Sequence, residues 1–134
     1  TALPLAGLHL LLAEDNELNS EIATALLEEQ GASITAVENG RLALEAIQNA
    51  APRTYDAILM DVMMPEMNGL EATRCIRAFE GKGPGEGTPI IAMTANVFAD
   101  DVKACLDAGM NSHVGKPLDM KVLIGEILKY TDAR

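Results

Sequence analysis

Short apolar runs alternate five times with longer amphipathic stretches along the chain. The apolar runs lie at residues 8–13, 33–37, 57–60, 90–93 and 112–114. Runs without a strict polar alternation are typical of strands that are covered on both faces, as in a parallel sheet. The stretches between them predict helices over residues 17–30, 39–50, 70–79, 99–108 and 119–127. The pattern therefore predicts a βα unit that is repeated five times.

The ends of the predicted helices carry residues that favour helix starts and stops. The candidate N-caps are Asn16, Asn39 and Asp119. Gly31 can end the first helix. This helix carries an apolar stripe at a spacing of four, made of Leu18, Ile22 and Leu26. Asn16 and Gly31 therefore agree with a first helix over residues 17–30.

Five βα units fill a chain of 134 residues and leave no room for a second domain. We expect an α/β fold with a doubly wound, five-stranded parallel sheet in the order 2-1-3-4-5. In this order the first strand is flanked on both sides. Residues 8–131 would form the domain, residues 1–7 a linker or remnant, and residues 132–134 a C-terminal tail.

The composition excludes several classes of function. Hydrophobic residues make up 49% and charged residues 22% of the chain, which is not the composition of a disordered protein. The formal net charge of -10 argues against binding nucleic acid and against direct membrane contact. Aromatic residues make up only 3%, so there is little material for stacking a small organic cofactor. The two cysteines do not make a disulfide framework, and a reduced, cytoplasmic location fits best.

Polar residues end or follow four of the predicted strands. Glu14 and Asp15 follow the first strand, Asp61 ends the third, Thr94 ends the fourth, and Lys116 follows the fifth. The carboxyl ends of parallel strands meet at one edge of a sheet, where ligands bind in folds of this kind. We therefore expect three carboxylates, a hydroxyl and an ammonium group to lie together.

This set of groups suits Mg²⁺ and phosphoryl transfer. Three neighbouring carboxylates repel one another, and a single lysine does not neutralise them. Oxygen ligands without histidine or cysteine at metal spacing indicate Mg²⁺, beside which a carboxylate can attack phosphorus. Mg²⁺ and Lys116 would offset the charge on the phosphoryl oxygens. Each residue taken alone also has an ordinary explanation as a turn, cap or solvated side chain, but their common edge favours a functional site.

Two segments resemble the receiver domains of two-component response regulators: Asp61-Val62-Met63-Met64-Pro65-Glu66-Met67-Asn68-Gly69, and Glu14-Asp15-Asn16 with Asn19. The resemblance covers nearly the whole chain and is strongest to receivers carried by hybrid sensor histidine kinases. It implies a flavodoxin-like (βα)₅ fold. It also implies that an aspartate accepts a phosphoryl group, with Mg²⁺, from a phosphohistidine of a histidine kinase or histidine phosphotransfer domain. Such a domain assists its own phosphorylation and dephosphorylation but is not itself an enzyme.

The resemblance also implies a role for each residue of the predicted metal site. Asp61 would be the phosphoacceptor and a metal ligand, and Asp15 would be a direct metal ligand. Glu14 would act mainly through metal-bound water. The backbone carbonyl of Met63 would complete the protein ligands of the metal, and Lys116 would bind the phosphoryl group.

A second group of residues would form the switch. Thr94 matches the switch hydroxyl, the small Ala95 would stand beside the phosphoryl group, and the loop after Thr94 would shift when that residue is drawn inward. Pro117 matches a proline whose peptide bond with Lys116 is usually cis. His113 stands where an aromatic residue is usual. Either this histidine takes over the aromatic switch, or the switch acts through the loop after Thr94.

Two other functions stay open at this point. A phosphatase of the haloacid dehalogenase type also uses an aspartate nucleophile, but it needs a second aspartate where this chain has Met63. A receiver-like binding module that is never phosphorylated would not need the intact acidic residues. The chain begins at Thr1 and is a stand-alone receiver or, as we favour, part of a hybrid kinase. In the second case it would be the cytoplasmic part of a kinase that can be membrane-bound.

Overall fold

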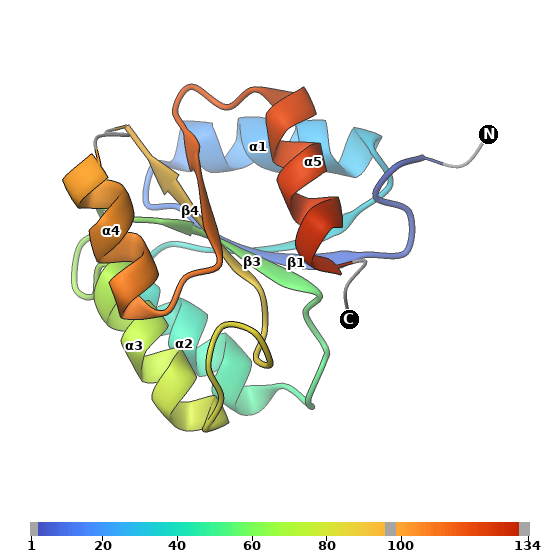
Figure 1. The fold of residues 1–134 in the computed structure, drawn as a ribbon. Helices are drawn as coiled ribbons and strands as arrows, with labels where there is room; N and C mark the ends of the chain where they lie inside the picture. Colours follow the sequence, from blue (N-terminus) through green and yellow to red (C-terminus); the bar gives the residue numbers. More distant parts are fainter. Residues whose placement is uncertain (1–2, 96–98, 132–134) are drawn as a thin grey trace.

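The computed structural model describes residues 3–95 and 99–131, which form a five-stranded parallel sheet with helices on both faces (Figure 1). The strands lie in the order β2-β1-β3-β4-β5, and each neighbouring pair is parallel. In chain order the elements are β1 (His9–Ala13), α1 (Glu17–Glu29), β2 (Ser33–Val37), α2 (Gly40–Asn49), β3 (Ala57–Asp61), α3 (Gly69–Glu80), β4 (Ile90–Thr94), α4 (Ala99–Ala108), β5 (Ser112–Gly115) and α5 (Met120–Thr131). The predicted flavodoxin-like fold and its strand order are confirmed.

Alternate residues of the inner strands pack on opposite faces of the sheet and form two hydrophobic cores. Leu10 and Leu12 of β1 belong to the core beneath α1 and α5, whereas Leu11 and Ala13 belong to the core beneath α2, α3 and α4. Every residue of β3 and β4 is buried. Strands covered on both faces have no polar side, which explains the continuous apolar runs in the sequence.

The apolar stripe predicted on the first helix does not face the core. Leu18 and Ile22 are 63% and 50% exposed, and the buried residues of α1 are Ala23 and Leu27. Leu18 and Ile22 are four residues apart, and so are the buried Ala23 and Leu27. The exposed stripe and the buried stripe are offset by one residue, or about 100° around the helix. The spacing therefore does not tell which stripe is buried. The structure leaves an apolar surface on the solvent side of α1.

The residues before β1 pack against the domain. Leu5 is fully buried in the core beneath α1 and α5, and its backbone N–H donates to the carbonyl of Gln30 at 2.9 Å. Residues 132–134 lie outside the described residues. The division of the chain into linker, domain and tail stays a prediction. Within the described ranges, no helix has the length and apolar character needed to cross a membrane.

A buried arginine ties α3 to the loops at the amino ends of β4 and β5. The Arg77 guanidinium donates to the carbonyls of Gly109 and Thr88, both at 2.8 Å, to Asn111 Oδ1 at 2.9 Å and to Glu80 Oε1 at 3.0 Å. Gly109 has a φ of +109°, and a Cβ there would lie 2.9 Å from Arg77 Cγ. Glycine is therefore required both by the backbone and by the close approach of the arginine.

Candidate functional site at the carboxyl edge of the sheet

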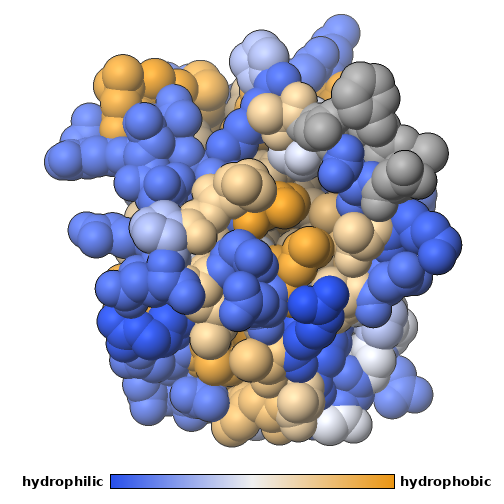
Figure 2. All heavy atoms as spheres, turned by 90° about the vertical axis from the view of Figure 1, so that its left-hand side faces the viewer, coloured by the Kyte–Doolittle hydropathy of each residue, from blue (hydrophilic) through white to orange (hydrophobic). Residues whose placement is uncertain are grey.

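The predicted site residues come from four strand ends that meet at one edge of the sheet. Glu14 and Asp15 follow β1, Asp61 ends β3, Thr94 ends β4, and Lys116 follows β5. Figure 2 shows the molecule from the side on which these strand ends lie, with hydrophobic residues near the centre of a largely hydrophilic face. The strand order places β1 and β3 side by side, which brings the acidic residues together.

Three carboxylates and one ammonium group form the site, which we call the acidic site (Glu14, Asp15, Asp61 and Lys116). Carboxylate oxygens of the three acids all lie within 4.8 Å of one another. Lys116 Nζ donates to Asp61 Oδ2 at 3.0 Å and to Glu14 Oε2 at 3.1 Å. Asp61 and Glu14 are each 5% exposed, whereas Asp15 is exposed. One lysine is therefore shared by two buried carboxylates.

Burial and crowding shift the proton affinities of these groups. Burial, followed by the contact with Glu14, raises the pKa of Asp61 to about 6, although Lys116 acts in the opposite direction. Burial would raise the pKa of Glu14, but hydrogen bonds with its neighbours outweigh burial and lower that pKa. Burial would lower the pKa of Lys116, but its bonds to the two carboxylates raise it. Without a metal, Asp61 therefore takes up a proton before Glu14 as the pH falls.

We expect the Asp61→Asn variant, in EDTA, to be more stable than the parent chain at neutral pH. Because the pKa of Asp61 is raised from 3.8 to about 6 on folding, the folded chain binds the proton more tightly than the unfolded chain. The stability of the parent therefore falls as the pH rises from about 4 to about 6. Asparagine does not ionise, so the variant escapes a cost of about 1–3 kcal/mol, since each tenfold change in proton affinity corresponds to about 1.4 kcal/mol.

Urea unfolding at several pH values measures this difference. The advantage of the variant should be full above about pH 6 and should shrink as the pH falls, disappearing below the unfolded-state pKa of 3.8, where Asp61 is protonated in both states. A variant that is equally stable or less stable at neutral pH would contradict the raised pKa.

The loop after β3 is held against the site by backbone contacts. The N–H of Val62 donates to the carbonyl of Met93 at 3.2 Å, and the N–H of Gly69 donates to the carbonyl of Val62 at 3.0 Å. A Cβ on Gly69 would collide with the backbone carbonyl of Asp61. The turn that carries the predicted phosphoacceptor therefore requires glycine at its far end.

The first turn of α1 also contacts the acidic site. Asn16 is the N-cap of α1, and its side chain accepts from the N–H of Asn19 at 2.9 Å. The side chain of Asn19 donates to Glu14 Oε1 at 3.2 Å. In the sequence, Asn19 is marked only by the resemblance to receivers. Its position three residues after an N-cap was the signal that could have placed it near the strand end.

The remaining predicted residues surround the acidic site. Met63 has a side chain that is 78% exposed, and its N–H donates to Asp61 Oδ1 at 3.3 Å. Thr94 is buried, and its carbonyl accepts from the N–H of Lys116 at 2.8 Å. Ala95 is exposed directly after β4, and residues 96–98 of the predicted switch loop lie outside the described residues.

Two predicted features belong to β5 and the segment that follows it. His113 is half-buried and pairs with Ala92 of β4 in the register of the sheet. The Lys116–Pro117 peptide bond is cis. The role of His113 in a switch stays a prediction.

The donor set of the acidic site fits a hard divalent cation. Its acidic groups offer only oxygen, and Lys116 supplies one positive charge against three negative charges. Mg²⁺ is bound by few carboxylates and keeps several waters, which suits a cluster with one exposed member, Asp15. The side chains of Asp15 and Asp61, with the backbone carbonyl of Met63, could hold such an ion.

A groove of about 550 Å³ opens beside the acidic site, and we call it the α1 groove. It is lined by Asn19, Ile22 and Leu26 of α1, by Glu14 and by residues 116–118. Its apolar wall includes part of the stripe that the helix leaves exposed. The groove thus joins an apolar surface to two members of the acidic site.

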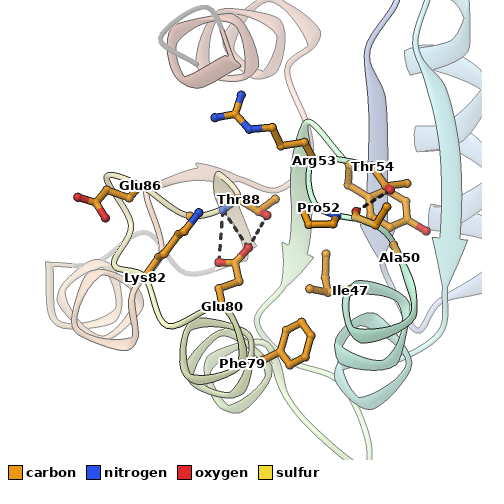
Figure 3. A pocket seen from close by; sticks show the side chains of 13 residues that line it. Ile47, Ala50, Pro52, Arg53, Thr54, Phe79, Glu80, Lys82, Glu86 and Thr88 are labelled. Atoms are coloured by element: carbon orange, nitrogen blue, oxygen red, sulfur yellow. Dashed lines mark hydrogen bonds between the residues drawn. The ribbon is translucent and has the colours of Figure 1, made fainter.

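A second cavity, of about 330 Å³, lies between the ends of α2 and α3 (Figure 3). Glu80 is directed toward Thr88 in this cavity and accepts from its hydroxyl at 2.6 Å, while also pairing with Arg77. The other charged residues that line it, Arg53, Lys82 and Glu86, are exposed. The buried polar groups of this cavity, Glu80 and Thr88, are thus already hydrogen-bonded. The candidate functional site is therefore the acidic site and not this cavity.

Comparison with known proteins identifies the family. The family model described as the response regulator receiver domain matches residues 10–128. The chain therefore belongs to the response regulator receiver domain family. The sensor protein GacS of Pseudomonas syringae is 39% identical over 121 residues, covering 90% of this chain and 13% of GacS. Histidine kinase 1 of Arabidopsis thaliana is 34% identical over 159 residues, covering 95% of this chain and 13% of that kinase.

Solved structures agree with this family. The receiver domain of a Pseudomonas aeruginosa sensor histidine kinase, solved with a magnesium ion in its active-site cleft, is 38% identical, with a TM-score of 0.81 and coverage of 95% of this chain and 99% of that chain. The receiver domain of Ssk1 from Saccharomyces cerevisiae, solved with the histidine phosphotransfer protein Ypd1, is 25% identical, with a TM-score of 0.85 and coverage of 96% and 91%. The resemblance to receivers of hybrid kinases is thus confirmed.

The phosphatase alternative finds no support at the site. The residue two positions after Asp61 is Met63, whose thioether side chain does not donate a proton to a leaving group. The family that matches the chain is a phosphoacceptor domain and not a phosphatase. The receiver is therefore a phosphoacceptor domain of a two-component phosphorelay.

Proposed function

We propose that Asp61 is the phosphoacceptor of this receiver and that it accepts the phosphoryl group with Mg²⁺ bound by Asp15, Asp61 and the carbonyl of Met63. Glu14 acts mainly through water bound to the metal. The observation that carries the proposal is the single lysine, Lys116, that lies within 3.1 Å of two buried carboxylates, of which one ends β3. The excess negative charge favours a cation, and the lysine is placed to meet phosphoryl oxygens.

The residues of the acidic site have different roles in the phosphoryl transfer. An unprotonated oxygen of Asp61 attacks the phosphorus of the donor and forms a new P–O bond. The bond from phosphorus to the leaving group breaks, and the leaving group keeps the electron pair. Lys116 donates to the phosphoryl oxygens, and Mg²⁺ when bound supplies further positive charge against them. Asp61 must be unprotonated to attack, and in the metal-free site burial raises the pKa of this residue to about 6.

The new phosphoryl group would act as a local switch. It adds about -1.5 to -2 charges at the end of β3. Thr94 is buried at the end of the neighbouring strand β4, where its hydroxyl gains a charged acceptor. Movement of Thr94 toward that acceptor would carry Ala95 and the loop after it, with His113 on β5 as a second candidate for the response.

The donor is a phosphohistidine of a histidine kinase or a histidine phosphotransfer domain. The α1 groove supports this partner, because its apolar wall lies next to Glu14 and Lys116. Leu18 and Ile22 extend the apolar surface along α1. A helix that presents a phosphohistidine could therefore cover apolar surface while its imidazole reaches the acidic site.

The chain is proposed to be part of a hybrid histidine kinase on the cytoplasmic side of the cell. It spans 13% of the length of GacS and of Arabidopsis histidine kinase 1, and relatives of this type support that larger context. The proposed domain itself covers residues 8–131.

Incubation with acetyl phosphate and Mg²⁺, followed by intact mass spectrometry, tests the proposed function. We expect one phosphoryl group to be added in Mg²⁺ and none when EDTA replaces the metal. A phosphorylated histidine phosphotransfer domain as donor tests the partner in the same assay. Failure to label in Mg²⁺ would contradict the proposal, and sustained release of phosphate from a generic phosphate ester would favour the phosphatase instead.

A further inference from the structure

Asn19 lines the α1 groove and also contacts the acidic site, where no role has yet been given to it. Its side-chain Nδ2 donates to Glu14 Oε1 at 3.2 Å. The other oxygen of this carboxylate, Oε2, accepts from Lys116 Nζ at 3.1 Å. Glu14 is only 5% exposed, so its orientation is set by these two protein donors more than by water.

The helix start fixes the position of Asn19. Its backbone N–H donates to Asn16 Oδ1 at 2.9 Å, which is the N-cap bond of α1. In a capping box, the side chain at this position returns a bond to the backbone of the cap residue. Here the amide reaches further back, to the carboxylate two residues before the cap. The backbone bond does not depend on the side chain, so the amide can be changed without removing the cap.

The two donors to Glu14 differ in their other hydrogen bonds. Lys116 is shared with Asp61, to which it donates at 3.0 Å. When a phosphoryl group is added to Asp61, Lys116 can donate to the phosphoryl oxygens, which are stronger acceptors than the carboxylates. The bond from Asn19 does not involve Lys116, and it can keep Glu14 in place when the lysine turns away.

We propose that Asn19 is a positioning residue for the Mg²⁺ site, which holds the Glu14 carboxylate within the acidic cluster independently of Lys116. Residues that orient metal-binding groups through hydrogen bonds typically change metal affinity by about 10–100-fold when they are replaced. This inference rests on the proposed function, because it requires that the acidic site binds Mg²⁺.

Calorimetric titration with Mg²⁺ alone tests the inference. Asn19→Ala is expected to bind Mg²⁺ about tenfold more weakly than the parent chain. Asn19→Gln keeps an amide donor and should recover part of the affinity. Asn19→Leu has a similar size without the donor and without an added charge, and it decides the question if the alanine variant folds poorly. Gln48→Ala, which removes an exposed amide from α2, is the matched control and should bind like the parent.

Labelling by acetyl phosphate gives a second readout. A positioning role predicts that Asn19→Ala needs about tenfold more Mg²⁺ for half-maximal labelling but approaches the parent rate at saturating Mg²⁺. A general loss of structure would lower the rate at every Mg²⁺ concentration. Equal Mg²⁺ affinities for the parent, alanine and leucine variants would overturn the inference alone. A parent chain that does not bind Mg²⁺ would overturn both the inference and the proposed function.

Discussion

The Asp61→Asn variant is expected to take up no phosphoryl group from acetyl phosphate under conditions that label the parent chain. An amide keeps the shape of the carboxyl group, but it is not a nucleophile toward phosphorus. The change also removes one of the three charges that make the acidic site suitable for Mg²⁺. Both effects act in the same direction, so intact mass spectrometry should show complete loss of labelling.

A second aspartate provides the control for this experiment. Asp107 is an exposed residue of α4 that pairs with Lys103 at 3.4 Å, far along the chain from the acidic residues. Asp107→Asn should label like the parent. If Asp61→Asn labelled at the parent rate, another residue would be the acceptor, and peptide mapping would identify it.

Replacing Arg77 with alanine is expected to lower the free energy of unfolding by about 3–5 kcal/mol, the cost of breaking a buried ion pair from one side. Arg77 and Glu80 are 9% and 14% exposed, and the guanidinium also donates to carbonyls before β4 and before β5. Without the arginine, the Glu80 carboxylate keeps only its bonds to Thr88, and these carbonyls lose a charged donor in a buried place. Urea unfolding monitored by circular dichroism measures the loss.

An exposed arginine in the same chain provides the comparison. Arg41 pairs with Glu45 at 2.6 Å and with Glu66 at 3.1 Å, but its side chain is 51% exposed. Arg41→Ala should change the unfolding midpoint little, because surface ion pairs contribute little to stability. Equal losses in the two variants would mean that burial of the Arg77 network is not what stabilises this end of the molecule.

The fold could be predicted because its signals are local and repeated. The continuous apolar runs at β1, β3 and β4 reflect burial on both faces of the sheet, and Asn16 and Asn39 cap the helices as predicted. The buried face of α1 could not be predicted, because Leu18 and Ile22 have the same spacing as the core residues. The neighbours that decide between two apolar stripes come from distant parts of the chain.

The acidic site could be predicted from topology, because the carboxyl ends of parallel strands meet at one edge. The hydrogen bonds within the acidic site could not be predicted from the sequence. The bond from Asn19 to Glu14 depends on the direction of one side chain at a helix start, and the shared position of Lys116 joins residues that are 55 and 102 positions apart. Arg77 likewise lies in the helix predicted over residues 70–79, and the carbonyls that it contacts, those of Thr88 and Gly109, belong to other segments of the chain.

The most direct test of this account is a crystal structure of the chain grown with Mg²⁺ and beryllofluoride, a mimic of the phosphoryl group. We expect Mg²⁺ to be bound by Asp15, Asp61 and the Met63 carbonyl, and the beryllium to be attached to an oxygen of Asp61. Lys116 and Thr94 should contact the fluorides. A metal bound elsewhere, or beryllium attached to another side chain, would contradict the account.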